Sequence, residues 1–106
     1  MAMFSVKTAE FEEKVLQASQ PVLVEFTAPW CGYCRRLAPV LDRMKDEPDT
    51  PMIGTIDIDE EPELARRYSV DTIPTLMLFK NGVPGTGLVA PGTAAQIKQW
   101  LSEQEG

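Results

Sequence analysis

The feature that most constrains the fold is the segment Val22–Thr27, which is rich in β-forming residues and almost continuously apolar. A strand with one face in water alternates apolar and polar residues, so this run predicts a strand that is covered on both faces. A central sheet enclosed by other elements is therefore expected. Four further strands are predicted at residues 4–7, 52–57, 75–80 and 86–90, the last of them after the tight-turn pair Asn81-Gly82.

Helical patterns occupy the intervals between these strands. The last of them carries Ile97, Trp100 and Leu101 on one face, which predicts that Trp100 belongs to the core. The predicted helices are residues 8–18 with Thr8 as the N-cap, residues 31–46 with a kink at Pro39, residues 59–68 with Asp59 as the N-cap, and a helix that opens at the capping box Thr93-Ala94-Ala95-Gln96.

These elements follow one another in the order β-α-β-α-β-α-β-β-α. The alternating first half implies parallel crossover connections, and the final hairpin adds antiparallel strands. We therefore predict an α/β fold with a mixed, five-stranded central sheet flanked by four helices. A chain of 106 residues suits one domain, which we expect to cover residues 1–106.

The net charge of the chain limits the classes of partner that are expected. Asp and Glu outnumber Lys and Arg by 16 to 10, and the formal net charge is −6. An acidic surface repels nucleic acid and anionic membranes, so neither is expected as a partner. The apolar runs are only a few residues long and residues 1–7 do not have the pattern of a secretory signal, which predicts a cytoplasmic protein.

The segment with the clearest chemistry is Cys31-Gly32-Tyr33-Cys34, which contains both cysteines of the chain. A zinc site needs about four ligands, and two thiols in a chain without histidine would need a partner chain to complete it, so no metal is expected. A c-type haem site needs a histidine after the second cysteine, where Arg35 stands. A purely structural disulfide is an alternative, but closing so small a loop contributes only about 2 kcal/mol. The remaining interpretation is a reversible dithiol–disulfide couple.

The position of the pair, after a strand and at the start of a helix, favours the redox interpretation. The free N–H groups and the dipole at a helix N-terminus stabilise a thiolate, which makes Cys31 the candidate nucleophile. Cys34 lies one turn further along and is the candidate resolving thiol. Glu25 interrupts the apolar strand six residues before Cys31. Either its carboxylate reaches water, or it is a half-buried acid with a raised pKa that accepts the proton of Cys34.

Two ordered motifs resemble the thioredoxin family. Residues 22–35 resemble the active-site segment of that family. A second motif has its Pro74 forty residues after Cys34: Ile73-Pro74-Thr75-Leu76 followed by Phe79-Lys80-Asn81-Gly82 resembles the cis-proline loop and hairpin of the family. Pro39 also lies where thioredoxins kink the active-site helix. The similarity extends over about residues 4–101, and the two motifs at the family's spacing make it specific.

The resemblance implies the thioredoxin fold and a protein-disulfide reductase that uses the Cys31–Cys34 couple without a bound cofactor. It implies that Pro74 is cis beside the cysteines, and that the backbone of Ile73 pairs with an extended substrate segment. The implied partners are protein disulfide substrates and an electron donor resembling thioredoxin reductase, and we expect a monomer. The implied substrate-binding surface consists of Trp30, Gly32, Tyr33, Ile73, Pro74, Val89 and Ala90.

Four positions depart from the usual thioredoxin pattern. Tyr33 replaces a proline, Thr55 a lysine near the buried acid, Asp71 an arginine and Ala90 a glycine. The backbone N–H of Tyr33 is able to stabilise a thiolate at Cys31, whereas a nearby carboxylate at Asp71 would oppose it. We expect a potential less reducing than that of ordinary thioredoxin, near or above about −270 mV.

Two alternative functions stay open on the sequence alone. The first is a disulfide oxidase or isomerase, because Glu25 and Ala28-Pro29-Trp30 look more like the corresponding residues of protein disulfide isomerases. The cytoplasm keeps thiols reduced, which argues against an oxidase or isomerase there. The second is a binding module with a thioredoxin fold whose cysteines are incidental, although both cysteines and the proline loop are intact.

Overall fold

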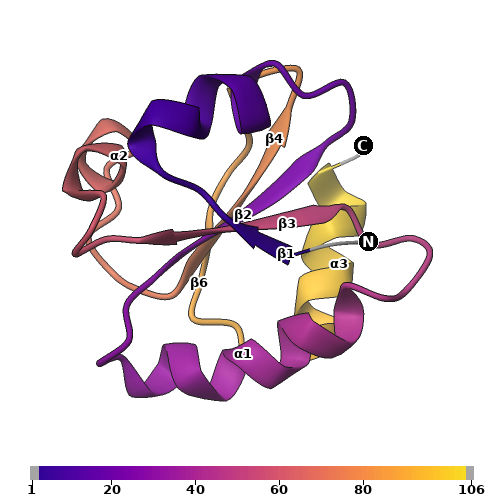
Figure 1. The fold of residues 1–106 in the computed structure, drawn as a ribbon. Helices are drawn as coiled ribbons and strands as arrows, with labels where there is room; N and C mark the ends of the chain where they lie inside the picture. Colours follow the sequence, from indigo (N-terminus) through magenta and orange to yellow (C-terminus); the bar gives the residue numbers. More distant parts are fainter. Residues whose placement is uncertain (1–2, 105–106) are drawn as a thin grey trace.

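The computed structural model describes residues 3–104, and its elements follow the order predicted from the sequence (Figure 1). The strands are β1 (Met3–Ser5), β2 (Val22–Thr27), β3 (Met52–Asp57), β4 (Thr75–Lys80), β5 (Val83–Pro84) and β6 (Leu88–Val89). The helices are the 3-10 turn η1 (Thr8–Glu10), the π-helical turn η2 (Glu12–Leu16), α1 (Gly32–Met44), α2 (Pro62–Arg67) and α3 (Ala94–Gln104).

The strands form one mixed sheet, as predicted. Their order is β1-β3-β2-β4-β5, and β6 also pairs with β4. β1 and β2 run parallel to β3, whereas β4 runs antiparallel to β2, and β5 and β6 run antiparallel to β4. The register places Glu25 of β2 beside Thr55 of β3 and Leu76 of β4, at the centre of the sheet.

Helices cover both faces of the sheet (Figure 1). α1 and α3 supply Leu37, Leu41 and Trp100 to a cluster that also contains Leu23 of β2. The turns η1 and η2 and helix α2 cover the opposite face. There Phe11, at the junction of the two turns, packs with Val15, Leu64 and the alternate β2 residues Val22, Val24 and Phe26. β2 is therefore buried on both faces and Trp100 lies in the core, as the sequence predicts.

The prediction of an α-helix over residues 8–18 is wrong in the type of helix and in the N-cap residue. Residues 8–18 contain a 3-10 turn followed by a π-helical turn, in which the N–H of Gln17 donates to the carbonyl of Glu12. Thr8 does not cap this segment, because its N–H and hydroxyl both donate to Oε1 of Glu61, at 2.8 and 2.9 Å. A bond to a residue distant in sequence overrides the local capping preference.

The predicted strand at residues 86–90 is replaced by two short strands. Asn81 and Gly82 have φ values of 53° and 78°, the left-handed conformations that a tight hairpin turn requires, so the predicted turn is confirmed. Pro84 and Gly85 follow at once, and neither residue type favours a continuous strand. The chain therefore leaves the sheet after β5 and returns to β4 as β6.

The other helix boundaries depend on local signals. α1 continues through Pro39 as one helix to Met44. α2 begins at Pro62, the proline expected near its start, and its N-cap residue is Glu61 in place of the predicted Asp59. The predicted capping box is present, since the N–H of Gln96 donates to Oγ1 of Thr93 at 3.1 Å, and the side chain of Gln96 accepts from the N–H of Thr93 at 3.3 Å.

Candidate active site

Cys31 and Cys34 form a disulfide at the start of α1, and their Cα atoms lie 5.2 Å apart. Cys31 is the N-cap residue of this helix, and its Sγ accepts a hydrogen bond from the N–H of Cys34 at 3.2 Å. This position lets the amide donors and the dipole of α1 stabilise negative charge on the Cys31 sulfur once the disulfide is reduced. The donor is the Cys34 amide, not the Tyr33 amide that the sequence suggested.

The loop before β4 lies against the Cys31 sulfur. The Ile73–Pro74 peptide bond is cis, as the resemblance implied. The Cys31 Sγ lies 3.8 Å from the carbonyl oxygen of Ile73, although the two residues are 42 positions apart in the sequence. Ile73 also packs against the small cluster formed by Ala28 and the two cysteines. The fold therefore brings both predicted motifs together at one end of the sheet.

β6 completes the edge of the site beside Pro74. The N–H of Ala90 donates to the carbonyl of Pro74 at 2.8 Å, and Val89 pairs with Thr75. Val89 is 55% exposed, so its side chain is free to contact another molecule. Ala90 has a φ of 49°, a left-handed conformation that costs a non-glycine residue roughly 1 kcal/mol, which explains why a glycine would suit this position.

Trp30 is held at the rim of the site by Asp59, which the sequence predicts as a helix N-cap. Its ring is 63% exposed, and its Nε1–H donates to Oδ2 of Asp59 at 2.7 Å. Asp59 follows β3 and is held in turn by a hydrogen bond from its own N–H to Oδ1 of Asp57 at 2.8 Å. A bond to a charged acceptor fixes the orientation of the indole while it leaves the ring face accessible.

Tyr33 is held by a neighbour on the same helix. Its ring is 63% exposed, and the guanidinium of Arg36 lies over it, 4.5 Å from the ring centroid. The two residues are three positions apart, the spacing at which side chains meet on a helix surface. This spacing is visible in the sequence and could have predicted the pair. Gly32, which precedes Tyr33, is half-buried.

Glu25 is a buried carboxyl at the centre of the sheet, so the interpretation in which it simply reaches water is wrong. Its side chain is 4% exposed, and Oε2 has no hydrogen-bond partner among residues 3–104. Burial raises the pKa of Glu25 to about 7. Thr55, its half-buried neighbour on β3, carries no charge that would oppose this shift. Glu25 is therefore able to bind and release a proton near neutral pH.

A hollow of about 310 Å³ opens beside Cys34. Its lining includes Cys34 and Arg35 from α1, and Thr55 and Asp57 from β3. Because Thr55 is the direct strand neighbour of Glu25, this hollow lies between the second cysteine and the strand position next to the buried acid. Asp71, in contrast, lies on the surface, where its carboxylate accepts a hydrogen bond from the Thr72 hydroxyl at 3.3 Å.

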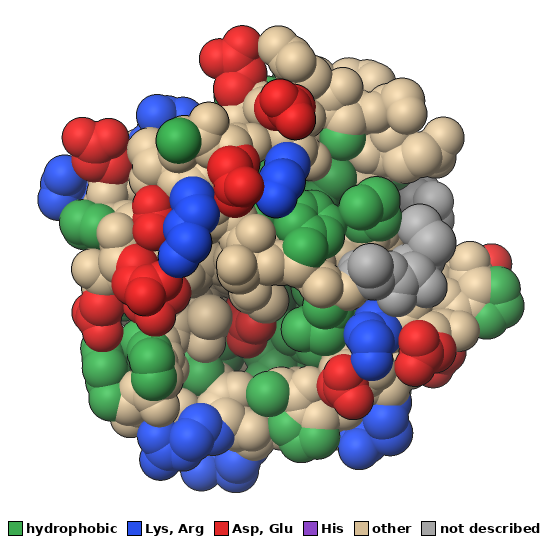
Figure 2. Space-filling view, in the orientation of Figure 1, with side chains coloured by type: hydrophobic (Ala, Val, Ile, Leu, Met, Phe, Trp, Pro, Cys, Tyr) green, Lys and Arg blue, Asp and Glu red, His purple; other side chains and the backbone are tan. Residues whose placement is uncertain are grey.

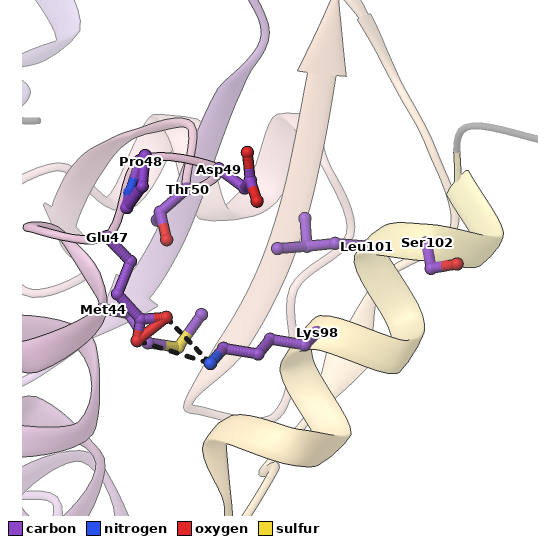
Figure 3. Close-up of a pocket in the computed structure, with 8 residues that line it drawn as sticks. All are labelled: Met44, Glu47, Pro48, Asp49, Thr50, Lys98, Leu101 and Ser102. Atoms are coloured by element: carbon purple, nitrogen blue, oxygen red, sulfur yellow. Dashed lines mark hydrogen bonds and ion pairs between the residues drawn. The ribbon is translucent and has the colours of Figure 1, made fainter.

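A larger cavity of about 490 Å³ lies at the other end of α1 and is separate from this site. Figure 3 shows Lys98 of α3 reaching across it to Glu47, with which it forms an ion pair at 2.8 Å. Met44 at its edge is the last residue of α1, twelve positions after Gly32 at its start, which corresponds to about 18 Å along a helix. The cysteines are therefore not part of this cavity.

Within residues 3–104, no group of three or more His, Cys, Asp or Glu side chains is placed to hold a metal ion. No helix in the same described range has both the length and the apolar character that crossing a bilayer requires.

Comparison with known proteins adds independent findings. The family model described as thioredoxin matches residues 2–103. A thioredoxin from Mycobacterium tuberculosis is 43% identical over 100 residues, which cover 92% of this chain and 86% of that protein. A thioredoxin from Acidithiobacillus ferridurans is 39% identical over 104 residues, covering 97% of this chain and 96% of that protein. A bifunctional thioredoxin reductase/thioredoxin from Mycobacterium leprae is 41% identical over 95 residues, covering 88% of this chain and 21% of that protein.

Proposed function

The chain belongs to the thioredoxin family and is a thiol–disulfide oxidoreductase of the disulfide-reductase type, and we propose that Cys31 is its nucleophile and Cys34 its resolving thiol. The observation that carries this assignment is the position of Cys31 as N-cap of α1, with its sulfur accepting the Cys34 amide. A thiolate at that position is stabilised by the helix, whereas one at Cys34, inside the first turn, is not favoured in the same way.

The reaction then has two thiol–disulfide exchanges. The Cys31 thiolate attacks one sulfur of the substrate disulfide, which forms a mixed disulfide and releases the other substrate sulfur as a thiolate. The Cys34 thiolate next attacks the Cys31 sulfur, which releases the second substrate sulfur and leaves the Cys31–Cys34 disulfide. The substrate gains two electrons, and the cysteine pair loses two.

We assign Glu25 the role of accepting the Cys34 proton before the second exchange. Its pKa of about 7 leaves a substantial fraction ionised at neutral pH, so it is able to act as a base there. The hollow beside Cys34 and Thr55 supports a path for this proton through solvent between the two groups. Thr55 contributes no charge to this path.

The exposed aromatic and apolar side chains around Cys31 are proposed as the substrate-binding surface. Trp30 and Val89 offer accessible apolar area, and Tyr33 and Gly32 lie between the two cysteines. The chain at Ile73, Pro74 and Ala90 would pair its backbone with an extended substrate segment, as an added strand does.

The remaining assignments concern the cellular context. A relative from Mycobacterium leprae is named as a bifunctional thioredoxin reductase/thioredoxin, and we propose a reductase of that kind as the electron donor of this chain. We also propose that the protein acts as a monomer in the cytoplasm, where thiols are kept reduced and a disulfide reductase has a source of electrons.

The assignment of the two cysteines is tested with insulin as substrate and dithiothreitol as electron donor. Cys31→Ser should abolish catalysed reduction. Cys34→Ser should still attack but stop at the mixed disulfide, which intact-protein mass spectrometry detects as a covalent adduct. Because the chain has two cysteines, any adduct of the Cys34→Ser protein is bound through Cys31. An adduct that forms with Cys31→Ser and not with Cys34→Ser would reverse the two roles.

A further inference from the structure

Two guanidinium groups lie against the turn that carries the cysteines. A Cβ atom built on Gly32 would lie 3.7 Å from Nη1 of Arg36 and 3.9 Å from Nη2 of Arg35. Nη1 of Arg35 also donates to the carbonyl of Pro29 at 2.9 Å, which ties this side chain to the segment before Cys31. Both arginines are exposed. The positive charge is therefore held at the first turn of α1, beside the reacting sulfurs.

This charge is not neutralised within the protein. Neither Arg35 nor Arg36 has a carboxylate within 4 Å among residues 3–104, whereas four lysines do, in ion pairs at Lys7, Lys14, Lys45 and Lys98. Other arginines also lack an ion pair, but these two alone line the first turn of the active-site helix. Figure 2 shows basic side chains gathered at the lower edge of the molecule, over the N-terminal half of α1.

Arg36 lies over the Tyr33 ring and makes no hydrogen bond or ion pair to another residue within residues 3–104. A guanidinium that lies over an aromatic ring uses its face for that contact, and its N–H groups point outward in the guanidinium plane. Those N–H groups match the two oxygens of a carboxylate. The Tyr33 ring therefore orients Arg36 in advance, which lowers the entropy lost when an anionic group binds.

Carboxylates stand on other segments that adjoin the site. Asp59 holds Trp30 there, and Asp71 stands two residues before Ile73 on the loop that lies against Cys31. A substrate segment that lies along the first turn of α1 meets the guanidinium groups of Arg35 and Arg36. A carboxylate on the segment is attracted to these guanidinium groups, and a carboxylate that instead approaches Asp59 or Asp71 is repelled.

We propose that Tyr33, Arg35 and Arg36 form a selective rim that favours disulfide substrates with Asp or Glu next to the reacting cysteine. The inference rests on the proposed function, because it concerns which disulfides reach the Cys31 sulfur. Exposed charge pairs contribute modestly, so two guanidinium groups should change kcat/KM about three- to tenfold, which corresponds to about 0.7–1.4 kcal/mol. The preference should weaken with salt, since both groups are exposed.

The test uses three synthetic peptides that each contain one intramolecular disulfide and differ only at the two residues beside the first cysteine, which are both Glu, both Gln or both Lys. The reduced protein is mixed with each peptide, and the peptide thiols formed in a single turnover are quantified by chromatography. The second-order rate constants should fall in the order Glu, Gln, Lys at about 0.01 M salt and converge at about 1 M salt, where the Debye length is about 3 Å.

Two double variants separate a local effect from a general one. Arg35→Gln with Arg36→Gln should remove most of the difference between the peptides. Arg43→Gln with Arg66→Gln removes the same charge from other exposed positions and should leave the preference unchanged. Urea unfolding of both variants checks that they are folded. Tyr33→Phe should keep the preference, because it keeps the ring under Arg36.

The outcomes distinguish this inference from the function on which it rests. Reduction of all three peptides at equal rates by the unchanged protein overturns the selective rim and leaves the reductase assignment intact. Failure to reduce even the Gln peptide overturns both. A preference that survives Arg35→Gln with Arg36→Gln, or a variant rate that falls by the same factor for all three peptides, also overturns the inference. The second result would mean that the guanidinium groups act on the thiolate and not on the substrate.

Discussion

The buried carboxyl of Glu25 makes the stability of the oxidised protein depend on pH. Burial raises its pKa from 4.5 to about 7, so the folded protein keeps a proton that the unfolded chain releases between these two values. The contribution of this proton to the free energy of unfolding is therefore largest below pH 4.5 and is lost as the pH rises to about 7. The difference in pKa corresponds to roughly 3 kcal/mol.

Glu25→Gln should remove this pH dependence, because an amide of nearly the same shape does not ionise. Urea unfolding of the oxidised variant and the unchanged protein at pH 4 and pH 8 gives four free energies. The variant should gain roughly 2–3 kcal/mol relative to the unchanged protein between the two pH values. Any constant cost of burying the amide cancels, because it is present at both pH values.

The composition of the chain leaves few other groups whose titration would contribute to this pH dependence. It has no histidine, and both cysteines are oxidised, so apart from the α-amino group no side-chain type that ordinarily titrates between pH 6 and 8 is present. Glu13→Gln is the matched control, since it makes the same chemical change at an exposed position and should alter stability by less than about 0.5 kcal/mol at either pH. If Glu25→Gln and Glu13→Gln gave the same pH dependence, the reasoning about burial would be refuted.

Three further predictions concern packing and the rim of the site. Leu41→Ala should lower the free energy of unfolding by about 2–5 kcal/mol, because Leu41 is fully buried, whereas exposed Val83→Ala should change it by less than about 0.5 kcal/mol in the same urea titration. Trp100→Phe should cost about 1 kcal/mol or more in urea unfolding, because the indole N–H no longer donates to the Thr86 carbonyl. Asp59→Ala should lower kcat/KM for insulin reduction several-fold with a stability loss below about 1 kcal/mol, since the exposed Trp30 ring loses its anchor, and Asp59→Asn should retain most of the activity.

The parts of the fold that the sequence predicted are those set by local patterns. The continuous apolar run of β2, the Asn81-Gly82 turn and the Thr93–Gln96 capping box each depend on a few neighbouring residues, and each is confirmed. Cys31 and Cys34 were identified for the same reason, because their spacing and position at a helix start are visible in one short segment. Their proposed roles in the reaction stay predictions.

The parts that were missed depend on contacts between distant residues. Thr8 has the side chain of an N-cap, but its partner is Glu61, which directly precedes α2. Asp59 also has the side chain of a cap, and it instead holds the Trp30 indole, 29 positions earlier. In both cases a short polar side chain was able either to cap a nearby helix or to bond a residue distant in sequence. In the folded structure it bonds the distant residue.

The pKa of Glu25 decides both how often its carboxyl is ionised at neutral pH and how strong a base the carboxylate is. A carboxyl with a pKa of 4.5 would be almost fully ionised at neutral pH but would be a weak base, and one with a much higher pKa would be a strong base that is rarely ionised. A pKa of about 7 lies between these cases and fits the proton-accepting role that we propose for Glu25. The uncharged Thr55 beside it preserves this balance, because a cation there would favour the carboxylate and lower the pKa. If the Cys31–Cys34 couple is oxidised by substrates and reduced by a donor, as proposed, the intermediate pKa suits the role that we assign to Glu25 in both directions.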